Sequence, residues 1–384
     1  WSGRQLLDEI SDVIRLDDDR SGKKVLITLE SLLENQPEVR TIDLLKSLPA
    51  KSIFLDLDAL LQLADRWKTA LREQQNLVLA LGELQTQERL KANTIKELDD
   101  SSLTFSELIP LDVPHRSSPL ILEAWLPPRE SVKRSSWIVF MPGLGGSQEH
   151  FRWLGRELSF NGWPVVVLEH PGSGVKAVQE LLEGKNVVPG AEVLPERLAD
   201  LQAVLSFREN GGFNLKNEKL VLMGHSLGAL TSFLASGVTP EEGLRERCST
   251  ALDDLSLTNL SQLLQCQLLD VQLENQDEIS DLKAIIAINS FGSLLWPNDR
   301  DAEIPVPVFL IGGTLDLITP PIQEQLGLFL ATTPHPFSRT LLVEGASHFS
   351  LVRVEGQNKR ERGDDLFQLD DAFVGVEPLA VQSL

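Results

Sequence analysis

The feature that most constrains this chain is one serine set between two glycines. Four apolar residues, 220–223, lead into Gly224, Ser226 and Gly228, and a second apolar run follows at helical spacing over 229–235. This order predicts a buried strand, a tight turn and a helix. Glycines lack a Cβ atom, so strand and helix can pass close together beside a strained serine. The segment therefore predicts an exposed Ser226 hydroxyl at the carboxyl end of a strand.

Apolar runs typical of strands alternate with helical patterns on both sides of this turn. Strands are expected at 102–108, 120–125, 137–140, 164–168, 284–289, 306–311 and 339–343, and helices at 149–160, 194–210 and 321–331. Such alternation predicts an α/β fold with a mostly parallel central sheet flanked by helices. The alternation stops over 238–282, where short helical patterns predict an inserted helical lid.

Residues 1–95 follow a helical rhythm without a convincing strand, so we expect an all-α N-terminal domain ahead of the α/β domain at 96–384. The longest helix is expected from about Asp58 to Leu90, with Leu, Ala and Trp along one side. A stripe of this kind is more often packing than a ligand groove. The segment has no histidine and no cysteine. We therefore expect it to serve structure, gating or contact with a protein partner.

Charge narrows the kinds of partner. The chain has 384 residues and a net charge of −21, which disfavours nucleic acid and anionic membranes as charge partners. No apolar run approaches the roughly 18 residues of a transmembrane helix. We therefore expect a soluble protein with no transmembrane segment.

The two cysteines, Cys248 and Cys266, both lie in the expected lid segment. They are either buried free thiols or a disulfide that closes this loop. A disulfide would imply an oxidising compartment and favour a periplasmic or secreted protein over a cytoplasmic one.

A serine nucleophile needs a base, a group that orients the base, and donors for an oxyanion. Asp316 and His348 each follow an expected strand, so both are expected at the edge of the sheet where Ser226 lies. His335 is the other histidine beyond Asp316, but it lies between two prolines ahead of the last strand. We therefore expect Ser226, Asp316 and His348 to be the catalytic residues.

The expected oxyanion donors are the backbone N–H groups of Leu227, directly after the serine, and Leu144, in the glycine-rich loop 143–146. Glycines in that loop would let the backbone approach a substrate carbonyl. The further pocket candidates are Gly143, Gly145, His225 and His170. No zinc spacing, phosphate loop or complete dinucleotide fingerprint is found, so we expect no metal and no cofactor.

Several of these motifs together resemble one family. The stretches are 142–145, 170–173, 224–228, 259–266, 313–316 and 344–349. They resemble bacterial α/β-hydrolases grouped with dienelactone hydrolases and with platelet-activating-factor acetylhydrolase-like lipases. The resemblance implies a Ser-His-Asp triad, which falls on Ser226, His348 and Asp316. Dienelactone hydrolases use a cysteine nucleophile, so a serine at 226 favours hydrolysis of esters or lipids.

Residues 3–75 resemble the later part of a helical domain of unknown function that precedes such hydrolases in photosynthetic bacteria. This resemblance implies that the N-terminal domain is truncated at its start.

The sequence thus predicts a serine carboxyl-ester hydrolase whose lid, 238–282, shapes the pocket for a small or lipid-like ester. One alternative is a phospholipase or lipase that acts on lipid acyl esters. An alternative of another class is a non-catalytic binding or scaffold protein on a hydrolase fold.

Overall fold

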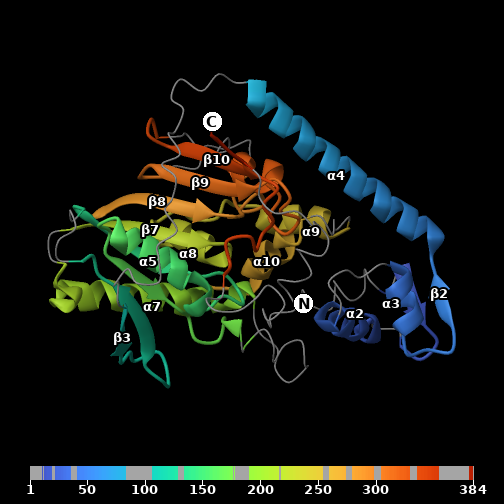
Figure 1. Ribbon diagram of the computed structural model, residues 1–384, viewed down its shortest axis with the longest axis horizontal. Helices are drawn as coiled ribbons and strands as arrows, with labels where there is room; N and C mark the ends of the chain where they lie inside the picture. The colour runs from blue at the N-terminus through green and yellow to red at the C-terminus, as the bar shows by residue number, and fades with distance from the viewer. Residues whose placement is uncertain are drawn as a thin grey trace.

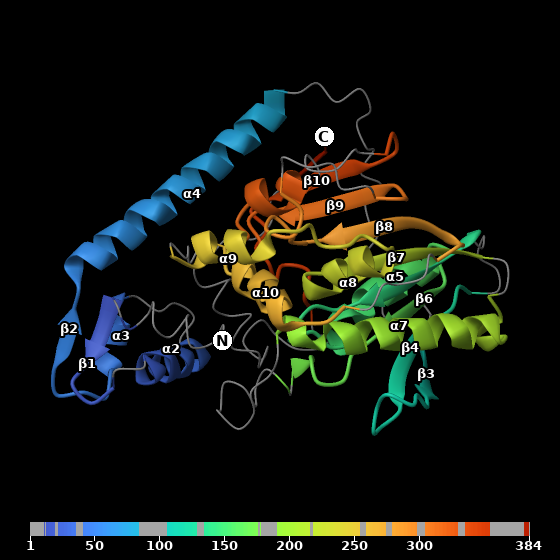
Figure 2. The same cartoon turned by 180° about the vertical axis from the view of Figure 1, so that it is seen from behind.

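A computed structural model describes residues 11, 13–19, 22–35, 41–83, 106–128, 134–175, 177, 190–215, 218–253, 259–273, 279–297, 304–328, 335–353 and 380–383. Its centre is a nine-stranded sheet in the order β11-β10-β9-β8-β7-β5-β6-β4-β3, shown from two sides in Figures 1 and 2. The strands are β3 (Ser106–Leu111), β4 (Leu120–Trp125), β5 (Ser136–Met141), β6 (Val165–Leu168), β7 (Lys219–His225), β8 (Leu282–Ile288), β9 (Val308–Gly313), β10 (Arg339–Glu344) and β11 (Ala380–Ser383).

Most of the central pairings are parallel, as the alternation of strands and helices predicts. Strands β6, β5, β7, β8, β9 and β10 run parallel, whereas β3 and β4 at one edge and β11 at the other pair antiparallel. The flanking helices are α5 (Arg152–Phe160), α7 (Leu194–Glu209) and α8 (Leu227–Ala235). The carboxyl ends of β5, β7, β8, β9 and β10 therefore meet at one edge of the sheet.

Side chains of the central strands alternate between two apolar cores, one on each face of the sheet. In β7, Leu220 and Leu222 belong to the core formed with α7 and α8. Val221 and Met223 belong to the other core, which contains Leu154 of α5. This period of two places the four apolar side chains of β7 alternately in the two layers. Because both faces are covered, the central strands read as continuous apolar runs in the sequence.

The N-terminal part departs from the predicted all-α composition. Its described helices are α2 (Lys23–Asn35), α3 (Thr41–Ser47) and the long α4 (Leu57–Glu83). It also contains β1 (Ile14–Leu16) and β2 (Ile53–Leu55), which pair antiparallel. The expectation of a region without strands is therefore wrong. Each strand has three residues, which is too short for a periodic pattern to reveal.

Parts of several expected elements lie outside the described residues. These are the end of the long helix beyond Glu83, the first residues of the strand expected at 102–108, and the last residues of the helix expected at 321–331.

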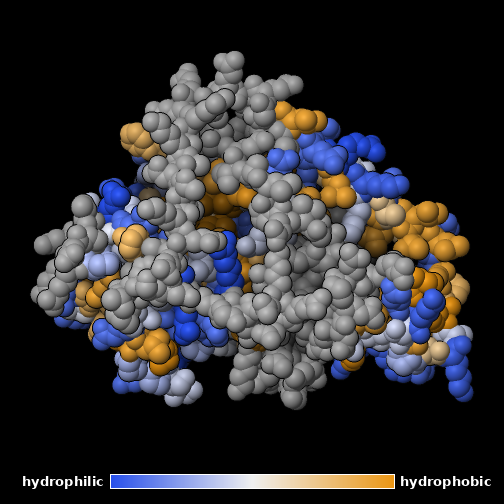
Figure 3. Space-filling view, viewed as in Figure 1, coloured by the Kyte–Doolittle hydropathy of each residue, from blue (hydrophilic) through white to orange (hydrophobic). Residues whose placement is uncertain are grey.

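Apolar side chains gather on the outside of the N-terminal part. Phe54, Leu57 and Leu61 are 56%, 64% and 66% exposed. Figure 3 shows apolar residues on its right-hand side, where Figure 1 places β2 and the first turns of α4. No helix among the described residues is long and apolar enough to cross a membrane.

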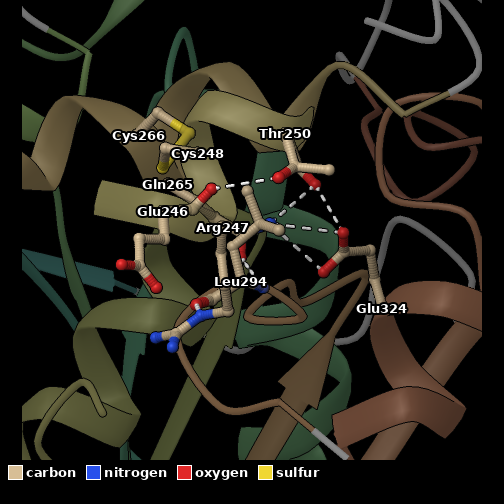
Figure 4. The surroundings of a disulfide bond; sticks show 9 residues. Glu246, Arg247, Cys248, Thr250, Gln265, Cys266, Leu294 and Glu324 are labelled. Atoms are coloured by element: carbon tan, nitrogen blue, oxygen red, sulfur yellow. Dashed lines mark hydrogen bonds between the residues drawn. A yellow bond between two sulfur atoms is a disulfide. The ribbon is translucent and has the colours of Figure 1, made fainter. Parts of the chain in front are cut away.

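The expected insertion contains α9 (Leu244–Asp253), α10 (Ser261–Gln267) and the short 3-10 helix η4 (Leu268–Asp270). A disulfide between Cys248 of α9 and Cys266 of α10 joins the two helices, with their Cα atoms 5.5 Å apart. Figure 4 shows this disulfide with Gln265 and Glu324 close to it. The helical content of the insertion agrees with the sequence, but its contacts bind it to the body of the protein, as described below.

Candidate active site

Ser226 lies at the sharp turn between β7 and α8. Its backbone angles are φ 52° and ψ −120°, in a region that residues with a side chain rarely adopt. The strained turn is stabilised on both sides: the amide of Ser226 donates to the carbonyl of Ile288 at 2.8 Å, and its carbonyl accepts the amide of Ala229 at 2.9 Å. The turn thus fixes the serine at the carboxyl end of a central strand.

The two flanking glycines are required by close backbone contact. A Cβ atom on Gly224 would lie 2.2 Å from the carbonyl carbon of Gly228. A Cβ on Gly228 would lie 1.9 Å from the carbonyl oxygen of Met141 in β5. Real Cβ contacts are never this short, so a larger residue at either position would displace α8 from β7 or from β5. The prediction of a close strand–helix crossing is confirmed.

Asp316 and His348 form a buried pair at the same edge of the sheet. Nδ1 of His348 lies 2.8 Å from Oδ2 of Asp316. Asp316 also accepts the amides of Ile318 and Thr319 on Oδ1, at 2.9 and 2.7 Å, and the Thr319 hydroxyl on Oδ2 at 2.6 Å. All these partners donate, which is the pattern of a carboxylate oriented toward the imidazole. The histidine therefore carries its proton on Nδ1, and its Nε2 is left as the basic nitrogen.

The backbone of His348 is held by two side chains from neighbouring strands. Its carbonyl accepts Nε2 of His225 and Nδ2 of Asn289, each at 2.9 Å. Burial, and secondarily the nearby His348, lower the pKa of His225 to about 3. His225 is therefore a neutral donor that links the end of β7 to the loop after β10. The pocket-lining role expected for His225 from the sequence stays a prediction.

The glycine-rich loop after β5 lies directly against the serine. A Cβ on Gly143 would lie 2.9 Å from Cβ of Ser226. Gly145 has a φ of 75°, and its amide donates to the carbonyl of Ser173 at 2.8 Å. The amide of Gly146 donates to the carbonyl of Gly143 at 3.1 Å. These bonds close the loop into a turn beside Ser226.

A buried arginine fastens this loop to the body of the fold. Arg197 of α7 is 1% exposed. Its guanidinium donates to the carbonyl of Pro142, to the Ser173 hydroxyl at 2.8 Å and to the Thr231 hydroxyl at 3.1 Å. Burial lowers the pKa of Arg197 to about 9, and Asp200 opposes that shift. The side chain therefore remains a cation at neutral pH.

His170 belongs to the charged cluster around Asp200. Its Nδ1 lies 2.9 Å from Oδ2 of Asp200. The same oxygen pairs with Arg116 at 2.7 Å, and Oδ1 of Asp200 pairs with His115 at 2.7 Å. Burial, and then the charge of Arg197, lower the pKa of His170 to about 3. Burial alone would raise the pKa of Asp200, but the hydrogen bonds from His170 and Arg116 hold it well below its usual value. His170 thus supports the loop 170–173.

The two residues expected to supply oxyanion donors lie in the turns that follow β7 and β5. Leu227 is the first residue of α8. Leu144 lies in the loop after β5 and packs against the apolar core. Ser226 is 6% exposed, His348 2% and Asp316 0%, so the candidate site is deep. Among the described residues, no group of three or more His, Cys, Asp or Glu side chains could hold a metal ion.

Comparison with known families matches residues 138–356, more than half of the chain, to the alpha/beta hydrolase family. The chain belongs to this family, and its mostly parallel sheet flanked by helices is the fold of an α/β-hydrolase. No curated protein matches the chain.

Two solved structures are similar to the chain. One is an α/β serine hydrolase without a lid from Xanthomonas campestris, with a TM-score of 0.40 and 18% identity over 70% of this chain and 94% of that one. The other is an alpha-beta serine hydrolase homologue from Coxiella burnetii, with a TM-score of 0.38 and 16% identity over 69% of this chain and 95% of that one. The finer likeness to dienelactone hydrolases and acetylhydrolase-like lipases stays a prediction.

Several residues around the site were missed by reasoning from the sequence. They are Asn289, Thr319, Arg197, Asp200, Glu324 and Gln325. Only Asn289 has a sequence signal, because it follows a buried strand directly, where polar residues reach the edge of the sheet. Arg197 and Glu324 lie within helices and read there as ordinary surface charges.

Proposed function

We propose that this protein is a serine hydrolase that cleaves carboxylic esters through an acyl-enzyme intermediate. The observation that carries the proposal is the pair of His348 Nδ1 and Asp316 Oδ2, 2.8 Å apart, at the sheet edge where Ser226 is held in its strained turn. An imidazole oriented by a carboxylate and a serine held in a strained turn are two of the parts that serine hydrolysis requires.

In the proposed reaction, Nε2 of His348 takes the hydroxyl proton of Ser226 as Oγ attacks the ester carbonyl. Asp316 orients the resulting imidazolium and balances its charge. The proton then passes from His348 to the alcohol as the ester bond breaks. Water, deprotonated by His348, attacks the acyl-enzyme and releases the carboxylic acid with regeneration of Ser226.

The proposed oxyanion donors are the backbone N–H groups of Leu227 and Leu144. Leu227 begins α8, so its N–H belongs to the helix N-terminus, where negative charge is stabilised. In the loop after β5, the amides of Gly145 and Gly146 already donate to Ser173 and Gly143. These bonds favour Leu144 as the second donor.

The attachment of the insertion favours a small ester over an aggregated lipid. Lipases that respond to interfaces need a lid that moves. Here α10 is joined to α9 by the Cys248–Cys266 disulfide, and the amide of Ser261 donates to the carbonyl of Ile318 at 3.0 Å. We therefore propose that the insertion is a fixed wall of the pocket. A sharp rise in activity above the critical micelle concentration of the substrate would instead favour the lipase.

The first test is covalent labelling by a fluorophosphonate, followed by peptide mass spectrometry. We expect the label on Ser226, and we expect Ser226→Ala to lose about 10⁴-fold or more in kcat on short-chain esters. Ser249→Ala, which removes an exposed serine of α9, is the matched control and retains full activity. An unlabelled Ser226 in folded protein, or an active Ser226→Ala, would favour the scaffold alternative.

We also propose that the protein works in an oxidising compartment. The disulfide between Cys248 and Cys266 supports this, since structural disulfides form and persist outside the reducing cytosol. A mass difference of two hydrogens between native and reduced protein isolated from its source is the expected result.

A further inference from the structure

A fully buried glutamate lies close in sequence to Asp316. Glu324 is 0% exposed and belongs to η5 (Ile322–Leu326), a π-helical turn that follows the loop containing Asp316, here called the acid loop. Buried carboxylates are costly unless hydrogen bonds replace their water. Glu324 obtains that replacement entirely from groups that donate to it.

The first group of donors comes from the insertion. Three side-chain groups lie within hydrogen-bond distance of Oε1 of Glu324. They are Nδ2 of Asn259 at 2.8 Å, the hydroxyl of Ser261 at 3.1 Å and Nε2 of Gln265 at 3.2 Å. Gln265 is adjacent to Cys266 (Figure 4), so the disulfide holds α10, the helix that presents Ser261 and Gln265. The insertion is thus bound to Glu324 through several side chains of one short segment.

The second group of donors comes from the loop that follows β8. The amides of Gly292 and Ser293 donate to Oε2 of Glu324 at 2.8 and 3.0 Å, and the Ser293 hydroxyl donates to Oε1 at 2.8 Å. In the same loop, the amide of Leu294 donates to the side-chain oxygen of Gln265 at 2.7 Å. Both carboxylate oxygens therefore act only as acceptors, as in an ionised side chain.

Hydrogen bonds connect the turn that contains Glu324 to Asp316. The neighbouring Gln325 donates through Nε2 to the carbonyl of Thr319 at 3.0 Å and to the carbonyl of Ser290 at 2.7 Å. Thr319 donates through its hydroxyl and its amide to Asp316. The insertion also reaches this loop, through the bond from Ser261 to Ile318. The segment 316–325 is thus held at both of its ends.

We propose that Glu324 is a positioning residue, which fastens the insertion and the loop after β8 to the acid loop and so keeps Asp316 in place against His348. This inference rests on the proposed function for its catalytic consequence. Without the carboxylate, the N–H and O–H groups around residue 324 would lose their acceptors and η5 would shift. Thr319 would then no longer hold Asp316 in its present orientation. The effect would reach His348 only through Asp316.

The test is Glu324→Gln, which keeps the shape but sets an NH₂ group against donors. We expect kcat to fall about tenfold to hundredfold with KM within about twofold. The acid limb of the kcat/KM profile should move about one unit to lower pH, because a displaced Asp316 no longer stabilises the protonated form of His348. His225 does not interfere, since its pKa is lowered to about 3.

The matched control is Glu123→Gln. Glu123 is another buried carboxylate, 1% exposed, but it lies on β4 near the far edge of the sheet. We expect this variant to leave the pH profile unchanged. A second variant, Asn259→Ala, removes one donor to Glu324 and keeps the charge, so it should shift the profile in the same direction by less even if Glu324→Gln fails to fold.

A second readout separates this inference from the proposed function. The low-field proton resonance of Nδ1–H in a His–Asp pair reports the contact of His348 and Asp316 whether or not the protein hydrolyses anything. We expect Glu324→Gln and Asn259→Ala to shift or weaken it. An unchanged resonance and an unchanged profile in folded variants would overturn the inference. Absence of label on wild-type Ser226 would overturn only the proposed function.

Discussion

Two buried charged side chains fasten loops on opposite sides of Ser226, and they carry opposite charges. Arg197 binds the loop after β5 through the carbonyl of Pro142. Glu324 binds the loop after β8 through the amides of Gly292 and Ser293. Strands β5 and β8 are the two neighbours of β7. A cation therefore binds acceptors on one side of Ser226, and an anion binds donors on the other.

The two charges differ in what they connect. Arg197 joins parts of the α/β body, because its other partners are Ser173 and Thr231, and Thr231 lies on α8, the helix directly after Ser226. Glu324 joins the body to the inserted helix α10, and that helix has the disulfide as a further restraint. The loop after β5 therefore depends on the core itself, whereas the loop that contains Asp316 depends on an accessory segment.

The largest expected effect on stability comes from Arg197→Met. The change leaves buried acceptors without donors and removes a buried cation whose charge interacts with Asp200, so we expect the free energy of unfolding to fall by about 3–5 kcal/mol. Urea unfolding followed by circular dichroism measures it. Arg245→Met, at an exposed position of α9, is the control and stays within about 0.5 kcal/mol of wild type. A loss below about 1 kcal/mol for Arg197→Met would break the comparison.

A somewhat smaller effect is expected from the double variant Cys248→Ser, Cys266→Ser. The disulfide closes a loop with a sequence separation of 18 residues, and its removal should lower the free energy of unfolding by about 3 kcal/mol. Because Glu324 still binds α10, we expect esterase activity at 25 °C to stay within about twofold of wild type. A large loss of activity in the folded variant would show that the disulfide, and not Glu324, holds the acid loop in place.

The expected effect that is smallest at neutral pH comes from the cluster beside Arg197, because it develops only as the pH falls. The pKa of His170 falls from 6.5 to about 3 on folding, so the unfolded chain binds this proton first as the pH drops. The stability that depends on neutral His170 is fully present above about pH 6.5 and is lost as the pH falls toward about 3. The slope within this window is about 1.4 kcal/mol per pH unit for one proton.

His170→Asn tests this expectation, because its amide can donate to Asp200 in place of Nδ1 and does not titrate. Urea midpoints measured from pH 7 to pH 4 should fall less steeply in the variant than in wild type, by the equivalent of one proton. His225 has a similarly lowered pKa and supplies the slope that remains. Equal slopes in the two proteins would show that His170 is charged in the folded state and that the cluster carries one more positive charge.

Much of the architecture could be predicted from the chain. Strand β4 occupies the predicted residues 120–125, and most of the other described strands of the sheet overlap their predicted ranges. Their buried apolar runs are local patterns, which can be recognised in the sequence without knowledge of tertiary contacts. The β1–β2 pair was missed because its strands are very short. The helix predicted at 321–331 begins with the π-helical turn η5, which contains the buried Glu324 and Gln325.

The sequence by itself determined the sharp turn at Ser226. Its φ of 52° and the close crossing of β7 and α8 follow from glycines at 224 and 228. The sequence also ordered Asp316 and His348 after the correct strands. Only the tertiary structure decided what supports them, because Arg197 and Glu324 meet partners as distant along the chain as Pro142 and Asn259. A buried charge cannot be recognised in a sequence until its partners are known, since the same residue on the surface reads identically.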